Sequence, residues 1–136
     1  MGSKLKEQHD NFVTELRNVC SLNGITCRNS RSKHENATDL DFIVDTPYLP
    51  YGVIAHPTRS DKHCVPVITV DRWSRSISRV LVVIQADGYP CYNILRVLRR
   101  GKFQLGVEDQ KPYYLMDPVN SIPFISYCLG EPWATN

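Results

Sequence analysis

Apolar residues near the N-terminus recur at intervals of three and four. They are Leu5, Phe12, Val13, Leu16, Val19 and Cys20, and this spacing is typical of an amphipathic helix. Asn23 and Gly24 follow as a stop signal. The pattern predicts a helix over about residues 4–21, with Glu15 at the edge of its apolar stripe.

The next segments follow strand patterns. In "DLDFIVD", residues 39–45, Leu40, Phe42 and Val44 alternate with polar positions, which predicts a strand with one core face. "YGVIAH", residues 51–56, predicts a second strand that ends before a proline. "CVPVITVDRW" and "RVLVVIQAD" predict two more. The unbroken apolar run at residues 80–84 indicates burial on both faces of the sheet.

The second half of the chain combines one helix with weaker strands. "CYNILRVLRRG" predicts a helix over about residues 90–100, with Ile94, Leu95, Val97 and Leu98 inward and its arginines outward. "FQLGV" and "YYLM" predict short strands before a tail containing "IPFISYCL". We therefore predict an α+β (α/β-like) fold, in which a central mixed β-sheet of four to six strands is flanked by the two helices.

Length and composition suit one compact domain. A chain of 136 residues with 42% hydrophobic residues can build a single core but is short for two, so we predict one globular domain over residues 1–136. No apolar run approaches the roughly 18 residues of a membrane span, and the first residues lack the apolar stretch of a signal peptide. We expect a cytoplasmic protein without a membrane partner. The five cysteines lack C-x-x-C spacing, which indicates free thiols.

The positive charge is concentrated in the middle of the chain. Residues 59–102 carry nine Lys or Arg against three Asp, although the net charge of the whole chain is only +2. A basic block of this kind is typical of nucleic-acid binding. The candidate phosphate-binding residues here and in the preceding loop are Arg31, Lys33, Arg75, Arg79, Arg96, Arg99, Arg100 and Lys102. Solvated charges and helix-dipole effects are the alternative use of these residues.

Three aspartates share the strand at residues 39–45. Residues two apart on a strand point to the same side, so Asp39, Asp41 and Asp45 are expected on one face. Clustered carboxylates repel one another unless water or a cation compensates, and Mg²⁺ prefers such oxygen ligands. A metal site and a solvent-exposed strand face both explain the pattern. On this interpretation Asp41→Asn relieves repulsion and leaves the fold intact or slightly more stable.

The order of these motifs resembles a known superfamily. A helix carrying Glu15, then "GITCRNSRSKHENATDLDFIVD", then "YGVIAHPTRS" resembles the core of the PD-(D/E)xK (restriction-endonuclease-like) nucleases, which include Holliday-junction resolvases and viral cap-snatching endonucleases. The resemblance covers about residues 8–60. It implies a Mg²⁺-dependent endonuclease in which Glu15 and Asp39 or Asp41 bind the metal.

The sequence departs from this family at the next strand. Where the acid, spacer and lysine are expected, the chain has Ala55, His56 and Pro57. The candidate substitutes are Asp71, Gln85 and the triplet at residues 109–111. We therefore take Asp39, Asp41 and Asp71 as candidate catalytic residues, with a catalytically inactive version of the fold as an alternative.

A second resemblance uses the same residues. "NSRSKHENATDLDFIV" resembles the nucleotidyltransferase signature, which implies that Ser30, Asp39 and Asp41 serve Mg²⁺ and a triphosphate, with Asp71 as a third carboxylate. Asn29 stands where that signature has glycine. A third hypothesis is a non-catalytic binding or inhibitor protein with a protein partner. The leading hypothesis is a small metal-dependent nuclease-like protein that binds or cleaves nucleic acid, and a homodimer is left open.

Overall fold

The computed structural model describes residues 2–29, 40–57, 61–76, 79–107 and 110–130. A six-stranded sheet has the order β1-β2-β3-β5-β6-β9. Its strands are β1 (Cys27–Arg28), β2 (Phe42–Asp45), β3 (Pro50–His56), β5 (Val80–Ile84), β6 (Pro90–Asn93) and β9 (Ile122–Pro123). β3 and β5 are parallel and the other pairs are antiparallel. The predicted central mixed sheet is therefore confirmed.

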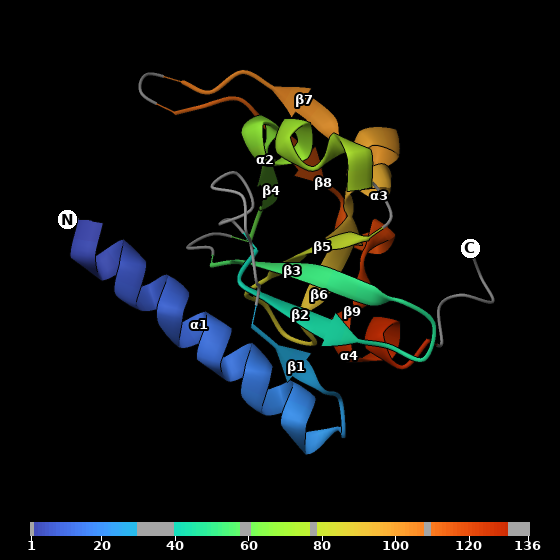
Figure 1. The fold of residues 1–136 in the computed structure, drawn as a ribbon. Coiled ribbons are helices and arrows are strands. Elements are labelled where there is room, and N and C mark those ends of the chain that lie inside the picture. The colour runs from blue at the N-terminus through green and yellow to red at the C-terminus, as the bar shows by residue number, and fades with distance from the viewer. Residues whose placement is uncertain (1, 30–39, 58–60, 77–78, 108–109, 131–136) are drawn as a thin grey trace.

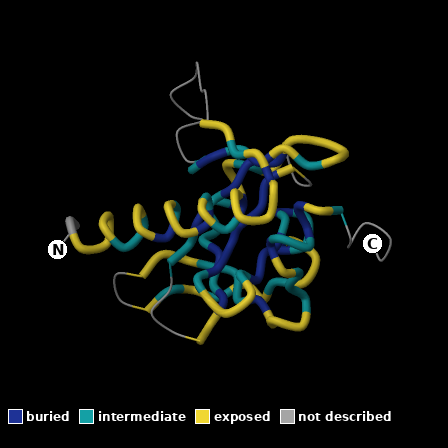
Figure 2. The backbone as a smooth tube through the Cα atoms, turned by 90° about the horizontal axis from the view of Figure 1, so that it is seen from below, coloured by how far each residue is buried: buried dark blue, intermediate teal, exposed yellow. Residues whose placement is uncertain are grey.

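Helices cover both faces of this sheet (Figure 1). α1 (Gly2–Leu22) and α4 (Phe124–Cys128) pack on one face, where Phe12, Leu16 and Phe42 belong to one core cluster. α2 (Val67–Arg72) and α3 (Ile94–Arg100) pack on the other face, where Val70 and Val97 belong to a second cluster. Every residue of β5 is buried, as its apolar run predicts. Figure 2 shows the buried backbone gathered in the central strands and exposed turns along α1.

A second, three-stranded sheet lies on the α2 and α3 side of the molecule. It has the order β4-β8-β7, from β4 (His63–Pro66), β7 (Lys102–Gln104) and β8 (Tyr113–Met116). Val65 and Met116 join the second core cluster, which holds the small sheet against the large one. The short 3-10 helices η2 (Ser74–Ser76) and η3 (Pro118–Asn120) complete the described elements. The sequence predicted strands at β7 and β8, but it did not predict that they form a separate sheet.

The predicted strand over residues 64–73 is wrong in its second half. β4 ends at Pro66, and residues 67–72 form α2. Proline cannot donate a ladder hydrogen bond, so it favours a strand end. The Val67 N–H instead donates to the Pro112 carbonyl oxygen at 3.1 Å, and the helix buries only Val70. Tertiary packing here overrides the β propensity of the β-branched residues.

The predicted helix over residues 90–100 begins later than expected. Residues 90–93 pair with β5 as β6, and α3 begins at Ile94. The Asn93 side chain accepts a hydrogen bond from the Arg96 N–H at 2.7 Å, which makes it an N-cap. Leu98, predicted to point inward, is 46% exposed because it lies outside the narrow stripe that meets the sheet.

The structure agrees more closely with the expectations for the first helix, the cysteines and the membrane. α1 lies where the sequence predicts it. Of the strand predicted over residues 39–45, β2 begins only at Phe42; Phe42 and Val44 are buried, and Leu40, just before the strand, is half-buried. All five cysteines are free. None of the helices in the described ranges is long and apolar enough to cross a membrane.

Candidate functional site

Asp41 lies just before β2 and is fastened to the neighbouring strand. Its N–H donates to the Val53 carbonyl oxygen at 2.8 Å, and its Oδ2 accepts from the Ala55 N–H at 2.7 Å. The side chain is 14% exposed. Because both the backbone and the carboxylate bond to β3, the position of this acid is fixed relative to the sheet.

His9 approaches Asp41 from α1. Its Nε2 lies 2.9 Å from Asp41 Oδ1, and its Nδ1 lies 3.2 Å from Asp10 Oδ1. Partial burial acts to lower the pKa of His9, but the charges and hydrogen bonds of Asp41 and Asp10 together outweigh it, so the pKa is raised. In the protonated ring both nitrogens donate to carboxylates, and the raised pKa shows that Asp41 and Asp10 favour this form.

Three further polar residues gather at the same end of the sheet. β3 and β5 are parallel, and His56 at the end of β3 is opposite Ile84. Gln85 follows β5, and its N–H donates to the His56 carbonyl oxygen at 3.3 Å. Gln8 Nε2 of α1 donates to Gln85 Oε1 at 3.4 Å. Burial, and after it the charge of His9, lower the pKa of His56.

We call Gln8, His9, Asp41, His56 and Gln85 the Asp41 cluster. It lies at the carboxyl ends of a parallel strand pair, where open α/β sheets commonly bind ligands. Its side chains supply one carboxylate, two imidazoles and two amides. The cluster can therefore hold hydrogen-bonding groups in fixed positions, and its acid already has His9 as a partner.

The described residues of this cluster do not fit Mg²⁺. That ion prefers octahedral oxygen ligands and usually takes one or two carboxylates. Asp41 is the cluster's one carboxylate, and both of its oxygens already accept hydrogen bonds. Within the described ranges, no three His, Cys, Asp or Glu side chains are arranged to hold a metal ion. No catalytic step is therefore assigned to a metal ion at this cluster.

Glu15, the predicted helix ligand, makes different contacts. It is exposed on α1 and lines a cavity of about 340 Å³ with Gln85, Asp87 and Tyr89. Burial, and after it the hydrogen bond to Glu15, raise the pKa of Tyr89. The contact that α1 makes with Asp41 comes from His9, six residues and about 9 Å earlier along the helix axis.

The other candidate acids are not brought to Asp41 in the described structure. Asp71 is exposed on α2, which covers the opposite face of the sheet from α1. Asp45 ends β2 and forms a salt bridge with Arg28 at 2.9 Å. Asp39, Ser30, Arg31 and Lys33 lie outside the described residues. The nucleotidyltransferase hypothesis, which depends on two of these, stays a prediction.

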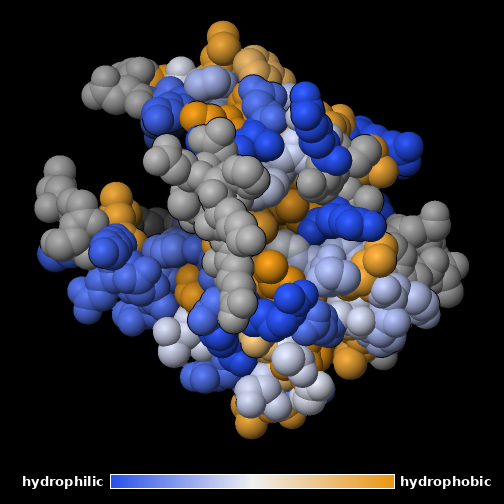
Figure 3. Space-filling model, viewed as in Figure 1, coloured by the Kyte–Doolittle hydropathy of each residue, from blue (hydrophilic) through white to orange (hydrophobic). Residues whose placement is uncertain are grey.

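The candidate phosphate-binding residues divide into two groups. Arg75 lies in η2, Arg96, Arg99 and Arg100 lie on α3, and Lys102 begins β7. All of these except the half-buried Arg96 are exposed. α3 contacts β8 of the small sheet, and Lys102 lies in that sheet itself. Figure 3 shows hydrophilic side chains interspersed with hydrophobic ones over the part of the surface that holds α2 and α3.

Arg79 is separate from this group. It directly precedes β5, at the opposite end of the strand from Gln85, and its carbonyl oxygen accepts from the Gly52 N–H at 2.8 Å. A strand of five residues spans roughly 16 Å. Arg79 therefore does not join the Asp41 cluster.

Sequence reasoning missed His9. A usable signal was present, since His9 precedes Phe12 by three residues and Leu16 by seven, which puts it on the apolar stripe of the predicted helix. A polar residue on that stripe points toward the sheet.

The fold resembles that of a solved nuclease. The structure of a Holliday junction resolvase, Hjc, from the archaeal hyperthermophile Archaeoglobus fulgidus superposes with a TM-score of 0.57. The match has 7% sequence identity and covers 88% of this chain and 94% of the resolvase. This likeness shows a shared fold. No family model and no curated protein sequence matches the chain.

Proposed function

We propose that this protein binds nucleic acid through the exposed cations at the end of α3 and the start of β7. The observation that carries the proposal is the position of Arg99, Arg100 and Lys102, three exposed cations within four residues where the helix turns into a strand. The resolvase-like fold supports it, because the comparison protein is a Holliday junction resolvase.

The chemistry of such a surface is electrostatic. Arginine and lysine side chains that neutralise phosphates release condensed counterions, so affinity falls with salt. Phosphate contacts position a protein on nucleic acid without reading its sequence. A surface of this kind therefore favours binding with little base specificity.

The test is the salt dependence of binding to duplex, single-stranded and four-way-junction DNA and to RNA. The logarithm of the binding constant should fall linearly with the logarithm of the salt concentration, and reversing Arg99 and Arg100 to Glu should flatten the slope by about two phosphate contacts. Reversing Lys4 and Lys6, which are exposed on α1, is the matched control and should leave the slope unchanged. Absence of binding at low salt would favour a protein partner instead.

A second candidate function is phosphodiester hydrolysis at the Asp41 cluster. The observation that favours it is the fixed position of Asp41, whose carboxylate accepts from the Ala55 N–H and lies beside the imidazole of His9. The test is cleavage of labelled DNA and RNA with Mg²⁺ or Mn²⁺.

Matched variants make the cleavage test specific. Asp41→Asn should abolish strand cleavage, whereas Asp45→Asn should not, because Asp45 is exposed and paired with Arg28 at the far end of β2, which Asp41 precedes. Consumption of a nucleoside triphosphate in place of cleavage would support the nucleotidyltransferase hypothesis. Binding without either activity would leave the binding function alone.

A further inference from the structure

The amino end of β5 brings two cations together from different elements. Arg79 directly precedes β5, and its carbonyl oxygen accepts from the Gly52 N–H at 2.8 Å. β6 runs antiparallel to β5, with Asn93 opposite Leu81, so β6 ends beside the start of β5. α3 begins at the next residue and carries Arg96 in its first turn. Because adjacent strands lie about 4.8 Å apart, the backbones that carry Arg79 and Arg96 are neighbours at this end of the sheet.

Two buried tyrosines connect these positions. The rings of Tyr51 and Tyr127 meet edge to face, with their centroids 5.5 Å apart. The alternation along β5 puts Arg79 on the same face of the sheet as Leu81, and Leu81 shares the first core cluster with Tyr51. The hydroxyl of Tyr127 accepts from the Asn93 side-chain N–H at 3.1 Å. Because Asn93 caps α3, the tyrosine pair connects Arg79 to the start of that helix.

The charges of both arginines act on these two hydroxyl groups. Burial, and after it the charge of Tyr127, raise the pKa of Tyr51, whereas the charge of Arg79 acts to lower it. Burial raises the pKa of Tyr127, whereas the charge of Arg96 acts to lower it. Nearby charges shift a pKa in this way, so each guanidinium group lies close to one hydroxyl of the pair. Arginine presents parallel N–H donors that match phosphate oxygens, and two such groups together favour a bound phosphate.

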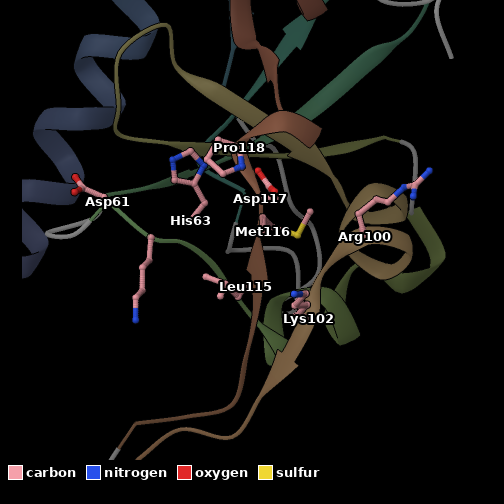
Figure 4. Close-up of a pocket in the computed structure, with 9 residues that line it drawn as sticks. Asp61, His63, Arg100, Lys102, Leu115, Met116, Asp117 and Pro118 are labelled. Atoms are coloured by element: carbon pink, nitrogen blue, oxygen red, sulfur yellow. The ribbon is translucent and has the colours of Figure 1, made fainter.

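α3 connects this pair of cations to the end of the helix. Residues three and four apart lie on one side of a helix, so Arg96, Arg99 and Arg100 follow one stripe of α3. Arg100 follows Arg96 by about 6 Å along the helix axis. Figure 4 shows the guanidinium of Arg100 directed outward, away from the cavity that His63 lines. The stripe therefore leads from the start of β5 to the cations of the proposed nucleic-acid surface.

We propose that Arg79 and Arg96 form a second phosphate-binding site, which holds one backbone phosphate of a nucleic-acid strand that lies along α3. Arg79 is exposed and Arg96 is half-buried, so packing holds one cation in place while the other reaches solvent. Among the described residues, no carboxylate forms a salt bridge with Arg79. The proposal deepens the nucleic-acid function and rests on it, because the strand that Arg99 and Arg100 bind supplies the phosphate.

The experiment is the salt dependence of binding to single-stranded DNA in variants of Arg79. Arg79→Gln should reduce the slope of the logarithm of the binding constant against that of the salt concentration by about 0.7, the value for one phosphate contact. It should also weaken binding at low salt on the order of tenfold, as expected for one charge-assisted contact. Arg79→Lys retains the charge and should retain the slope. Lys111→Gln is the matched control, because Lys111 is also exposed but precedes β8 of the small sheet.

The double variant tests whether both arginines hold the same phosphate. Adding Arg96→Gln to Arg79→Gln should cause little further loss of slope, because partners at one contact are not additive. Additive losses of two contacts would overturn the shared site. Circular dichroism checks that the half-buried position of Arg96 tolerates the change, and Arg79→Gln alone keeps the proposal testable if it does not.

Comparison with Arg99 and Arg100 separates this site from the proposed function. If reversing those two residues flattens the slope but folded Arg79→Gln protein keeps its slope and affinity, the second site is overturned and the nucleic-acid function stands. If Arg79→Gln reduces the slope and reversing Arg99 and Arg100 does not, the site at Arg79 is supported and the surface at the end of α3 is wrong. Absence of binding to any strand at low salt overturns both.

Discussion

At the scale of single residues, the hydrogen bonds of Asp41 give it a role in the stability of the fold. Its carboxylate accepts hydrogen bonds from His9 and from the Ala55 N–H. Asp41→Asn removes the charge that attracts His9, and hydrogen bonds to charged groups contribute about 1.5–3 kcal/mol when buried. Because His9 is partly exposed, we expect a loss of about 1–2 kcal/mol in urea unfolding.

The expected loss of stability in Asp41→Asn is opposite in sign to the small gain that the sequence alone predicts. The sequence interpretation has the aspartates repelling one another, whereas in the described structure Asp41 lies 2.9 Å from His9 Nε2, and this contact raises the pKa of the imidazole. A double-mutant cycle with His9→Gln tests the pairing, because partners in contact are not additive. Additive losses would show that the two side chains contribute independently.

His63 predicts how stability depends on pH. Burial holds its pKa below the usual value in the folded protein, so the unfolded chain binds the proton first as pH falls. The contribution of the neutral ring is therefore present above about pH 6.5 and is lost as pH falls below that value. His63→Gln should reduce the slope of unfolding free energy against pH in this window. An unchanged slope would assign the dependence to other groups, such as His56, whose pKa is also lowered.

At the scale of elements, the alternation in β2 carries a large share of the core. Phe42 is fully buried, and the guanidinium of Arg17 lies 5.5 Å from the centre of its ring. Phe42→Ala should cost on the order of 3–5 kcal/mol, because the site leaves a cavity in a packed core. Leu22→Ala is the control, since Leu22 is 86% exposed and should lose almost nothing. Chemical denaturation of both variants gives the comparison.

The junction between α3 and β7 depends on Gly101. A Cβ at this position would lie 2.6 Å from the Val97 carbonyl oxygen and 2.9 Å from Tyr114 Cβ. Neither atom is the flexible end of a side chain, so Gly101→Ala forces a backbone shift and should cost about 1–3 kcal/mol. The control is Leu98→Ala on the exposed face of α3, which should have little effect on the free energy of unfolding. Gly24→Ala is unsuitable as a control because the φ of Gly24 is positive. Thermal unfolding measures both.

The elements were predictable where local periodicity decides them. The helical stripe of α1, the alternation before Asp45 and the apolar run of β5 each have a single simple solution. The start of α3 and the helical structure of α2 were not predictable. The structure of residues 90–93 and 67–72 is determined by pairing and packing with distant residues rather than by local preference. The separate small sheet also depends on contacts between β4 and β8, about fifty residues apart.

At the scale of the whole molecule, the candidate site was only partly predictable. The motif drew attention to Asp41, but the partner of Asp41 depends on which face of α1 meets the sheet. That rotation presents His9 and not Glu15 to Asp41. A cavity of about 330 Å³ beside His63 could not be anticipated either, because it forms between the end of α3 and the strands β4, β7 and β8, which are distant in sequence.

Ligand-linked stability of the whole molecule distinguishes the proposed functions. A ligand that binds only the folded state raises the free energy of unfolding by about 2.7 kcal/mol when its concentration is a hundredfold above the dissociation constant. Nucleic acid at low salt should therefore raise the unfolding temperature, and salt should remove the gain. Mg²⁺ alone should leave it unchanged, because His9 already compensates Asp41 and the described donor set lacks the oxygens that Mg²⁺ prefers. A rise with Mg²⁺ that Asp41→Asn abolishes and Asp45→Asn retains would contradict this expectation and favour hydrolysis at the Asp41 cluster.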